Sequence, residues 1–267
     1  MSEKRYAWDS EDYAKHSAAQ FAWAKELVGK LGLRGDERLL DIGCGDGKAT
    51  AMIASMVPGG IVVGIDNSPD MIALARKQFP ESAHPRLRFD VMDARDLRFQ
   101  NEFDVAFSNA ALHWIRDHRP VLAGVRNSLV QSGRLLFQMA GRGNAAAMFE
   151  VADRLIRAPK WQGYFRGFGF SWQFCSAEEY RPLLDAAGLR ATRVELFPKI
   201  MEQNGRDGLA GWVRTTWLPY TDRAPADLRE SFIAELVDGY LALHPTASDG
   251  KVRVQMMRLE VEAQRVD

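Results

Sequence analysis

Residues 39–47 read Leu39-Leu40-Asp41-Ile42-Gly43-Cys44-Gly45-Asp46-Gly47, a short apolar run that ends in a glycine loop. Apolar residues at helical spacing follow over 50–57, and the Pro-Gly-Gly of 58–60 ends that pattern. A second apolar run, 61–65, has the composition of a buried parallel strand and is followed by Asp66. The stretch therefore predicts strand, glycine loop, helix and strand, which together form a βαβ unit.

The same alternation continues along the chain on both sides of this unit. Further strands are predicted at 87–91, 103–108, 134–139, 193–197 and 251–263, and helices at 17–31, 71–79, 117–130 and 177–187. No clear pattern covers 141–174, and 202–243 has helical spacing in pieces. We predict an α/β fold with a doubly wound, mostly parallel, seven-stranded Rossmann-like sheet. The last strand is expected to be antiparallel, with a bulge as the simplest account of its phase shift.

The composition restricts the function to a few classes. The 267 residues carry 35 Lys plus Arg against 35 Asp plus Glu, so no net charge attracts nucleic acid or an anionic membrane. Two cysteines far apart exclude a disulfide framework and a cysteine-based zinc site, and no metal site is expected. No apolar run of membrane-spanning length or secretion signal is present, so we expect a cytoplasmic protein with a small-molecule partner, as a monomer or homodimer.

The spacing of the glycines separates three kinds of glycine loop. A dinucleotide fingerprint would need Gly or Ala at Lys48 or at Thr50, depending on the register. A triphosphate-binding loop would need Gly at Ile42 and Ser or Thr at Ala49. Both patterns fail, which leaves the third kind, the glycine loop that methyltransferases use.

The motif at 39–47 resembles the first motif of class I S-adenosylmethionine-dependent methyltransferases. The resemblance implies S-adenosyl-L-methionine as cofactor and S-adenosyl-L-homocysteine as product. It assigns the methionine end to Asp41 and the glycine-loop backbone, the ribose hydroxyls to Asp66, and the adenine to Asp93 and Ala94. The cofactor-binding residues expected on this basis are Asp41, Gly43, Cys44, Gly45, Asp66, Asn67, Met71, Asp93, Ala94 and Asn109.

Each of these signals alone has an ordinary structural interpretation. The glycine loop could be a turn, Asp66 a helix-capping residue and Asp93 a solvated loop acid. However, each follows a successive predicted strand, and the carboxyl ends of parallel strands meet at one edge. Together they favour a cofactor site.

The methyl acceptor in this family lies after the fourth strand, where this chain reads Ser-Asn-Ala-Ala-Leu-His-Trp over 108–114. The Asn/Asp-Pro-Pro-Tyr/Phe signature of many base and amide methyltransferases is missing there. His113 is either a catalytic group or a packed histidine, and Trp114 a pocket wall or core ring.

Residues 8–20, 211–220 and 248–252 are similar to the trans-aconitate methyltransferase family. The resemblance implies one domain over 1–267, with an amino-terminal helical lid at 1–32, a cofactor-binding core at 33–140 and substrate-side insertions at 141–190 and 200–250. It places Tyr13, His16 and Gln20 in a lid that closes over the cofactor, with His16 and Gln20 as cofactor-binding residues. It also places Tyr13 beside the acceptor, together with His113. It further implies that Arg214 anchors a carboxylate of the acceptor. The alternative interpretation of Arg214 is an exposed arginine on a helix.

Seven aromatic residues lie between Trp161 and Phe174. They form either an apolar lid over the acceptor or the small core of the insertion. We therefore predict an enzyme that methylates a small molecule, most simply a carboxylic acid, either trans-aconitate-like or more apolar. The alternatives are a cofactor-binding regulatory protein without turnover and an RNA methyltransferase.

Overall fold

The computed structural model describes residues 18–170 and 172–266, which form two compact units. The sheet unit comprises 20–142, 172–197 and 258–266, and the helical unit comprises 18–19, 143–170 and 198–257. Two long strands, β6 and β7, contribute residues to both units.

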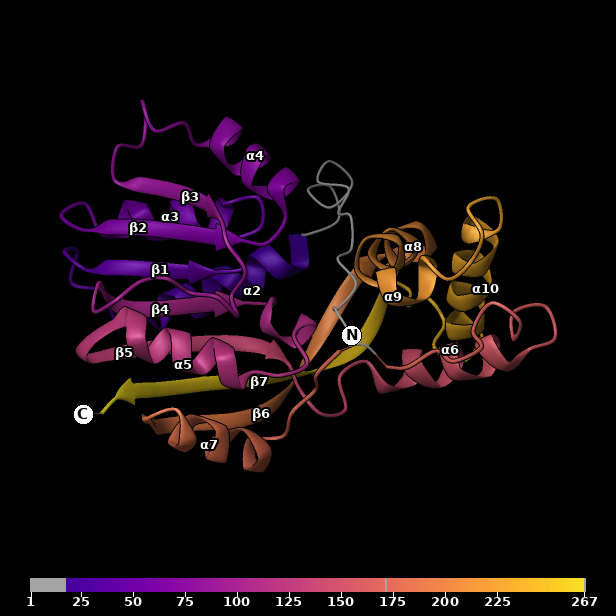
Figure 1. Ribbon diagram of the computed structural model, residues 1–267. Coiled ribbons are helices and arrows are strands. Elements are labelled where there is room, and N and C mark those ends of the chain that lie inside the picture. The colour runs from indigo at the N-terminus through magenta and orange to yellow at the C-terminus, as the bar shows by residue number, and fades with distance from the viewer. Residues whose placement is uncertain (1–17, 171, 267) are drawn as a thin grey trace. The chain divides into compact units, whose positions relative to one another are not determined.

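The sheet has seven strands in the order β3-β2-β1-β4-β5-β7-β6 (Figure 1). The strands are β1 Arg38–Ile42, β2 Ile61–Asp66, β3 Leu87–Val91, β4 Phe103–Asn109, β5 Leu129–Ala140, β6 Leu189–Asn204 and β7 Lys251–Arg265. All pairs among β1 to β5 are parallel, and β7 runs antiparallel to β5. The predicted mixed, mostly parallel, seven-stranded sheet is confirmed. The carboxyl ends of β1 to β5 therefore share one edge.

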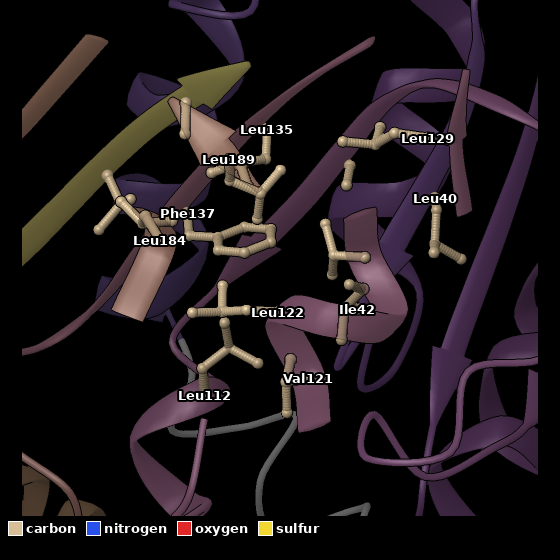
Figure 2. Packing of buried hydrophobic residues seen from close by; sticks show 14 of the residues in the cluster. Leu40, Ile42, Leu112, Val121, Leu122, Leu129, Leu135, Phe137, Leu184 and Leu189 are labelled. Carbon is tan, nitrogen blue, oxygen red and sulfur yellow. The ribbon is translucent and has the colours of Figure 1, made fainter. Parts of the chain in front are cut away.

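Helices cover both faces of the sheet within the sheet unit. They are α2 Ala18–Gly29, α3 Lys48–Met56, α4 Pro69–Gln78, the 3₁₀ turn η1 Leu112–Trp114, α5 Arg119–Ser128 and α7 Ala177–Ala186. One apolar cluster joins α2, α3 and α4 to one face, and a second joins α5 and α7 to the other. Figure 2 shows the second cluster, where the Phe137 ring of β5 lies among leucines from β5, α5 and α7.

The last strand, β7, is expected from its sequence to contain a bulge. It has none where it pairs with β5. That pairing keeps one register from Ala140 opposite Arg258 to Arg134 opposite Gln264. Residues 258–261 are buried in succession because both faces of the sheet are covered there. The apolar side chains Leu259 and Val261 lie on one face, and the polar side chains of Arg258 and Glu260 therefore lie on the other.

The helical unit contains α6 Ala146–Arg157, α8 Gly205–Thr216, α9 Leu218–Thr221 and α10 Arg229–Leu241, together with the adjoining ends of β6 and β7. Helix α6 lies where the sequence shows no clear pattern. Only Met148, Val151 and Ala152 of its residues are buried, so its apolar face is short. Among the residues that the structure describes, no helix is long and apolar enough to span a membrane.

Candidate functional site

The glycine loop connects β1 to α3 and requires glycine at its first and last positions. Gly43 has φ 76° and Gly47 has φ 80°, backbone angles that L-residues rarely adopt. A Cβ on Gly43 would overlap the Cβ of Ala111, and a Cβ on Gly47 would lie 2.7 Å from the Phe89 ring. The loop is held by the amides of Gly43 and Cys44, which both donate to the Ile65 carbonyl of β2, at 2.8 and 3.0 Å. The glycine loop can therefore approach Ala111 and Phe89 this closely only because Gly43 and Gly47 have no side chain.

Gly45 is the exception within the loop. It also has a positive φ, 54°, but a Cβ there would meet no atom within 4 Å. The space beside Gly45 is open, so its backbone is accessible to a ligand.

Asp41 is a buried carboxyl group at the end of β1. It is 2% exposed, and its Oδ2 accepts a 2.7 Å hydrogen bond from the Thr50 hydroxyl of α3. Burial is the main cause of a pKa of about 7 for Asp41; the Thr50 hydrogen bond opposes the rise, and the negative charge of Asp66 adds to it. A cationic ligand beside Asp41 would favour the ionised form.

Asp66 ends β2 and joins two segments of the site. One carboxylate oxygen accepts from the Gly45 amide at 3.1 Å and the other from the Ser68 amide at 2.9 Å. Burial raises its pKa, and hydrogen bonds from the Ser68, Gly45 and Asn67 amides oppose that rise. A carboxylate has about four lone-pair positions, so beside these three amides Asp66 can still accept a hydroxyl donor. The helix cap here is Ser68 rather than Asp66, since the Ser68 hydroxyl accepts from the Met71 amide at 3.3 Å.

Asp93 lies two residues after β3 and is half-buried. Its carboxylate accepts from Arg95, whose Nε donates to Oδ1 at 2.9 Å and whose Nη2 donates to Oδ2 at 2.6 Å. The Arg95 amide also donates to Oδ1, at 2.9 Å. Close by in the chain, Ala94 is half-buried, while Met71 is buried and Asn67 exposed, both near the start of α4. The expected residues on β1, β2 and β3 thus all lie at the carboxyl edge.

Asn109 and His113 occupy the same edge after β4. Asn109 pairs with Gln138 of β5, and His113 lies in η1 directly after it. Among the described residues, none hydrogen-bonds to the buried Nδ1 of His113. Burial, aided by the positive charge of Arg258 and by His118, lowers the pKa of His113 well below 6.5, so its imidazole is neutral at physiological pH.

A buried histidine fixes the position of this turn. His118 is 2% exposed, and its Nε2 lies 2.9 Å from the Leu112 carbonyl, which can only accept. Nε2 therefore carries the hydrogen, and Nδ1 accepts from the Tyr180 hydroxyl of α7 at 3.1 Å. The pair connects α7 to η1 and hence to His113.

Two functional candidates were missed by the sequence interpretation, Arg258 and Glu260 of β7. Both are buried, at 3% and 0% exposure. The Arg258 Nε donates to Gln138 Oε1 at 3.4 Å, and the Gln138 amide nitrogen donates to Glu260 Oε2 at 2.8 Å. Charged residues within a strand usually indicate the face of the strand that is exposed to solvent. Arg258 and Glu260 differ from such residues because both faces of the sheet are covered at their positions.

Arg214 lies in α8 of the helical unit. Its Nε and Nη2 donate to the Glu230 carboxylate, at 2.9 and 2.6 Å. Its side chain is 37% exposed. Within the helical unit, the structure therefore brings Arg214 together with Glu230. Tyr13 and His16 lie outside the described residues, and Gln20 is described only as backbone of α2.

The aromatic segment is divided between the two units. Trp161 and Phe165 pack on Phe232 of α10, with ring centroids 5.1 and 5.3 Å apart, as a core of the helical unit. In the sheet unit, Trp172 and Phe174 stack on each other, and Phe174 lies 6.3 Å from the His113 ring. The interpretation as a core is confirmed for Trp161 and Phe165, and the interpretation as a lid over the acceptor stays a prediction.

Comparison with known proteins identifies the family to which this chain belongs. Residues 39–133 match the family model described as a methyltransferase domain. A trans-aconitate 2-methyltransferase of Variovorax paradoxus (strain S110) is 30% identical over 97% of this chain and 98% of its own length. This chain belongs to the class I S-adenosylmethionine-dependent methyltransferases. An uncharacterized methyltransferase of Schizosaccharomyces pombe is also 30% identical, over 97% of the chain and 98% of its own length.

A solved structure agrees with the fold of this methyltransferase. A putative methyltransferase from Bacillus halodurans C-125 superposes with a TM-score of 0.60 at 16% identity, over 92% of this chain and all of the other. The enzyme therefore uses S-adenosyl-L-methionine as its cofactor. The site suits that molecule, because buried carboxyl groups and open glycine backbone can receive an ammonium, a ribose diol and an adenine. Among the described residues, no cluster of three His, Cys, Asp or Glu could hold a metal ion.

Proposed function

We propose that this methyltransferase transfers a methyl group to a carboxylate oxygen of a small organic acid and forms a methyl ester. The observation that supports this most directly is the change of charge along the carboxyl edge of the sheet. Asp41 and Asp66 lie at the carboxyl ends of β1 and β2, and Asp93 lies two residues after β3. Beyond β4, the edge carries the neutral His113 and the cationic Arg258. The buried Glu260 of β7 is paired with Lys30 and Arg193.

The acceptor's chemistry follows from this charge. An alcohol or an ammonium must lose a proton before it attacks the methyl carbon, so such an acceptor needs an effective base. His113, with its pKa far below 6.5, is a weak base. A carboxylate is already ionised at neutral pH and needs only to be held in line with the methyl group.

The cofactor is proposed to be held by the residues that converge on the first three strands. Asp41 and the backbone of Gly43, Cys44 and Gly45 receive the methionine end, and the Asp66 carboxylate and Asn67 receive the ribose. The adenine lies between Met71 and the Asp93–Ala94 segment. Arg95 holds the Asp93 carboxylate in place through three hydrogen bonds, from its Nε, its Nη2 and its amide. Asn109 and His113 border the reacting methyl group.

The proposal is tested with cofactor that carries a tritiated methyl group. The purified protein is incubated with panels of organic acids, phenols and amines, and with RNA. Products are then treated with mild alkali, which releases volatile labelled methanol from methyl esters but not from ethers or methylamines. We expect alkali-labile label with acids. Alkali-stable label, or label on RNA, would refute the carboxylate assignment.

The Asp66 assignment is tested separately by cofactor binding. Asp66→Asn keeps one acceptor oxygen but removes the charge, and we expect S-adenosylhomocysteine affinity to fall by about 1–3 kcal/mol, the worth of charged hydrogen bonds. Asp70→Asn makes the same chemical change on the exposed first turn of α4 and is the matched control. Equal affinities of the two variants would remove Asp66 from the cofactor site.

A further inference from the structure

Arg258 carries a buried positive charge that no carboxylate of the described chain neutralises. Its residue is 3% exposed, and its Nη2 has no hydrogen-bond partner among the described residues. The guanidinium donates a 3.4 Å hydrogen bond to Gln138. It also lies beside the Trp23 ring, whose centroid is 5.2 Å from the guanidinium carbon. Burial lowers its pKa to about 10, so the group remains protonated at neutral pH. Such a group is costly to bury unless something pairs with it.

The nearest acid in the strand, Glu260, is already engaged by other cations. Its carboxylate accepts from Lys30 Nζ at 2.9 and 3.0 Å, from Gln138 and from Arg193. Arg193 also pairs with Glu262. Lys30 also lies 3.8 Å from Glu26, and Arg193 lies 3.3 Å from Glu195. Each of these two cations therefore has a carboxylate partner in addition to Glu260. Among Lys30, Arg193 and Arg258, Arg258 is the one for which no ion pair is found in the described chain.

The position of Arg258 separates it from the proposed cofactor residues. It is paired with Ala140 at the carboxyl end of β5, and in the strand order β1-β4-β5-β7 it is three strands away from Asp41. At a strand spacing of about 4.8 Å this is about 14 Å across the sheet. The end of β4 is nearer, since Asn109 is paired with Gln138, to which the Arg258 Nε donates. The turn η1, which contains His113, follows shortly after Asn109 in the chain. Arg258 therefore lies on the acceptor side of the carboxyl edge.

We propose that the Arg258 guanidinium binds a carboxylate of the methyl acceptor, and specifically one that is not methylated. The inference rests on the proposed function. A guanidinium offers two parallel N–H groups to a carboxylate, and the Trp23 ring beside it limits its orientation. A carboxylate held in this way has its oxygen lone pairs drawn toward the cation, so it is a poor nucleophile. The acceptor therefore carries at least two carboxylates, one anchored by Arg258 and one at the methyl group.

The test uses binding, so that it does not depend on turnover. The probe is trans-aconitate, added to protein saturated with S-adenosylhomocysteine and measured by calorimetry, with its neutral trimethyl ester as the uncharged comparison. We expect Arg258→Met to weaken trans-aconitate binding about 10- to 100-fold, as loss of a charged buried hydrogen bond does. Affinity for S-adenosylhomocysteine should change less than about twofold, and Arg258→Lys should recover part of the loss.

Control variants distinguish the possible failures. Arg98→Met removes a surface arginine that is 76% exposed and paired with Asp96, and should leave both affinities unchanged. Met replaces an unpaired buried charge with an apolar chain of similar length, so the fold should persist, and the thermal midpoint verifies this. Loss of S-adenosylhomocysteine binding instead would assign Arg258 to the cofactor. Wild-type protein that does not discriminate between the acid and its ester would also overturn the proposal, as would Arg214→Met weakening trans-aconitate binding where Arg258→Met does not.

The outcome can be separated from that of the proposed function. If trans-aconitate binds through Arg258 but no alkali-labile label forms, the anchor stands and the methylation of a carboxylate fails. If label forms equally well on monocarboxylic acids in the wild type and in Arg258→Met, the proposed function stands and the anchor fails.

Discussion

The protonation of Asp41 should make cofactor binding depend on pH in a defined way. Asp41 has a pKa of about 7, and its proposed ligand end carries an ammonium and a sulfonium. A cation binds the ionised carboxylate, so affinity follows its ionised fraction, which is about one half at pH 7 and about 3% at pH 5.5. We therefore expect S-adenosylmethionine affinity to fall about 16-fold between pH 7 and pH 5.5 through this residue alone. The ligand's ammonium stays protonated throughout that window.

Calorimetry in buffers of different ionisation enthalpy measures the linked proton directly. Binding at pH 7 should release about half a proton per cofactor from Asp41. Asp41→Asn should bind more weakly at pH 7 and lose this share of the pH dependence. Asp66, whose pKa is also raised, is measured in parallel as Asp66→Asn so that the two contributions are separated. A wild-type profile that is flat, or an equally steep one in Asp41→Asn, would refute the reasoning.

Asp41 should also make the free energy of unfolding depend on pH. That free energy should fall as pH rises, whereas the affinity for the cofactor should increase. The folded pKa of Asp41 lies above its ordinary value of 3.8, so the folded protein binds more protons than the unfolded chain between about pH 4 and pH 7. The unliganded protein should therefore lose stability as pH rises through this window, by on the order of 4 kcal/mol from this group. Chemical denaturation at several pH values should show a smaller loss in Asp41→Asn.

Three further variants test the packing around the site. Gly43→Ala should destabilise the fold by more than the roughly 1–2 kcal/mol of a positive φ alone, because its Cβ meets that of Ala111, and adding Ala111→Gly should restore the excess in a double-mutant cycle of urea midpoints. Trp161→Ala removes a ring with 0% exposure and should cost about 3–5 kcal/mol in denaturant unfolding, while an unchanged midpoint would show that the ring is not a core residue. Tyr180→Phe leaves His118 Nδ1 without its donor and should cost about 1–3 kcal/mol, which a thermal melt with no shift would contradict.

The sequence predicts the cofactor half of the fold well because its signals are local. Strands buried on both faces appear as continuous apolar runs, and the runs 39–42, 61–65 and 87–91 agree with β1, β2 and β3 to within one residue. The glycine loop and the acids that follow these strands need no knowledge of distant contacts. Their convergence on one edge then follows from the parallel order of the strands.

The substrate side could not be predicted in the same way, since its residues are defined by distant partners. Strand β6 runs from Leu189 to Asn204, whereas only 193–197 has a strand pattern, because few of its side chains are buried. Arg214 matches a family motif but pairs with Glu230. Arg258 has no motif, and its importance appears only when Lys30 and Arg193, more than sixty residues away in sequence, are seen to neutralise Glu260 instead.

The antiparallel direction of β7 has a consequence for how substrate preference can change in evolution. The parallel strands deliver site residues from the loops after their ends, and loops tolerate insertions and deletions. Strand β7 delivers Arg258 from its interior, in continuous register with β5. A one-residue insertion before Arg258 would turn it to the opposite face of the sheet. Diversification at this position is therefore confined to point substitution, and relatives with another residue there should differ in the acid they accept while keeping the length of the strand.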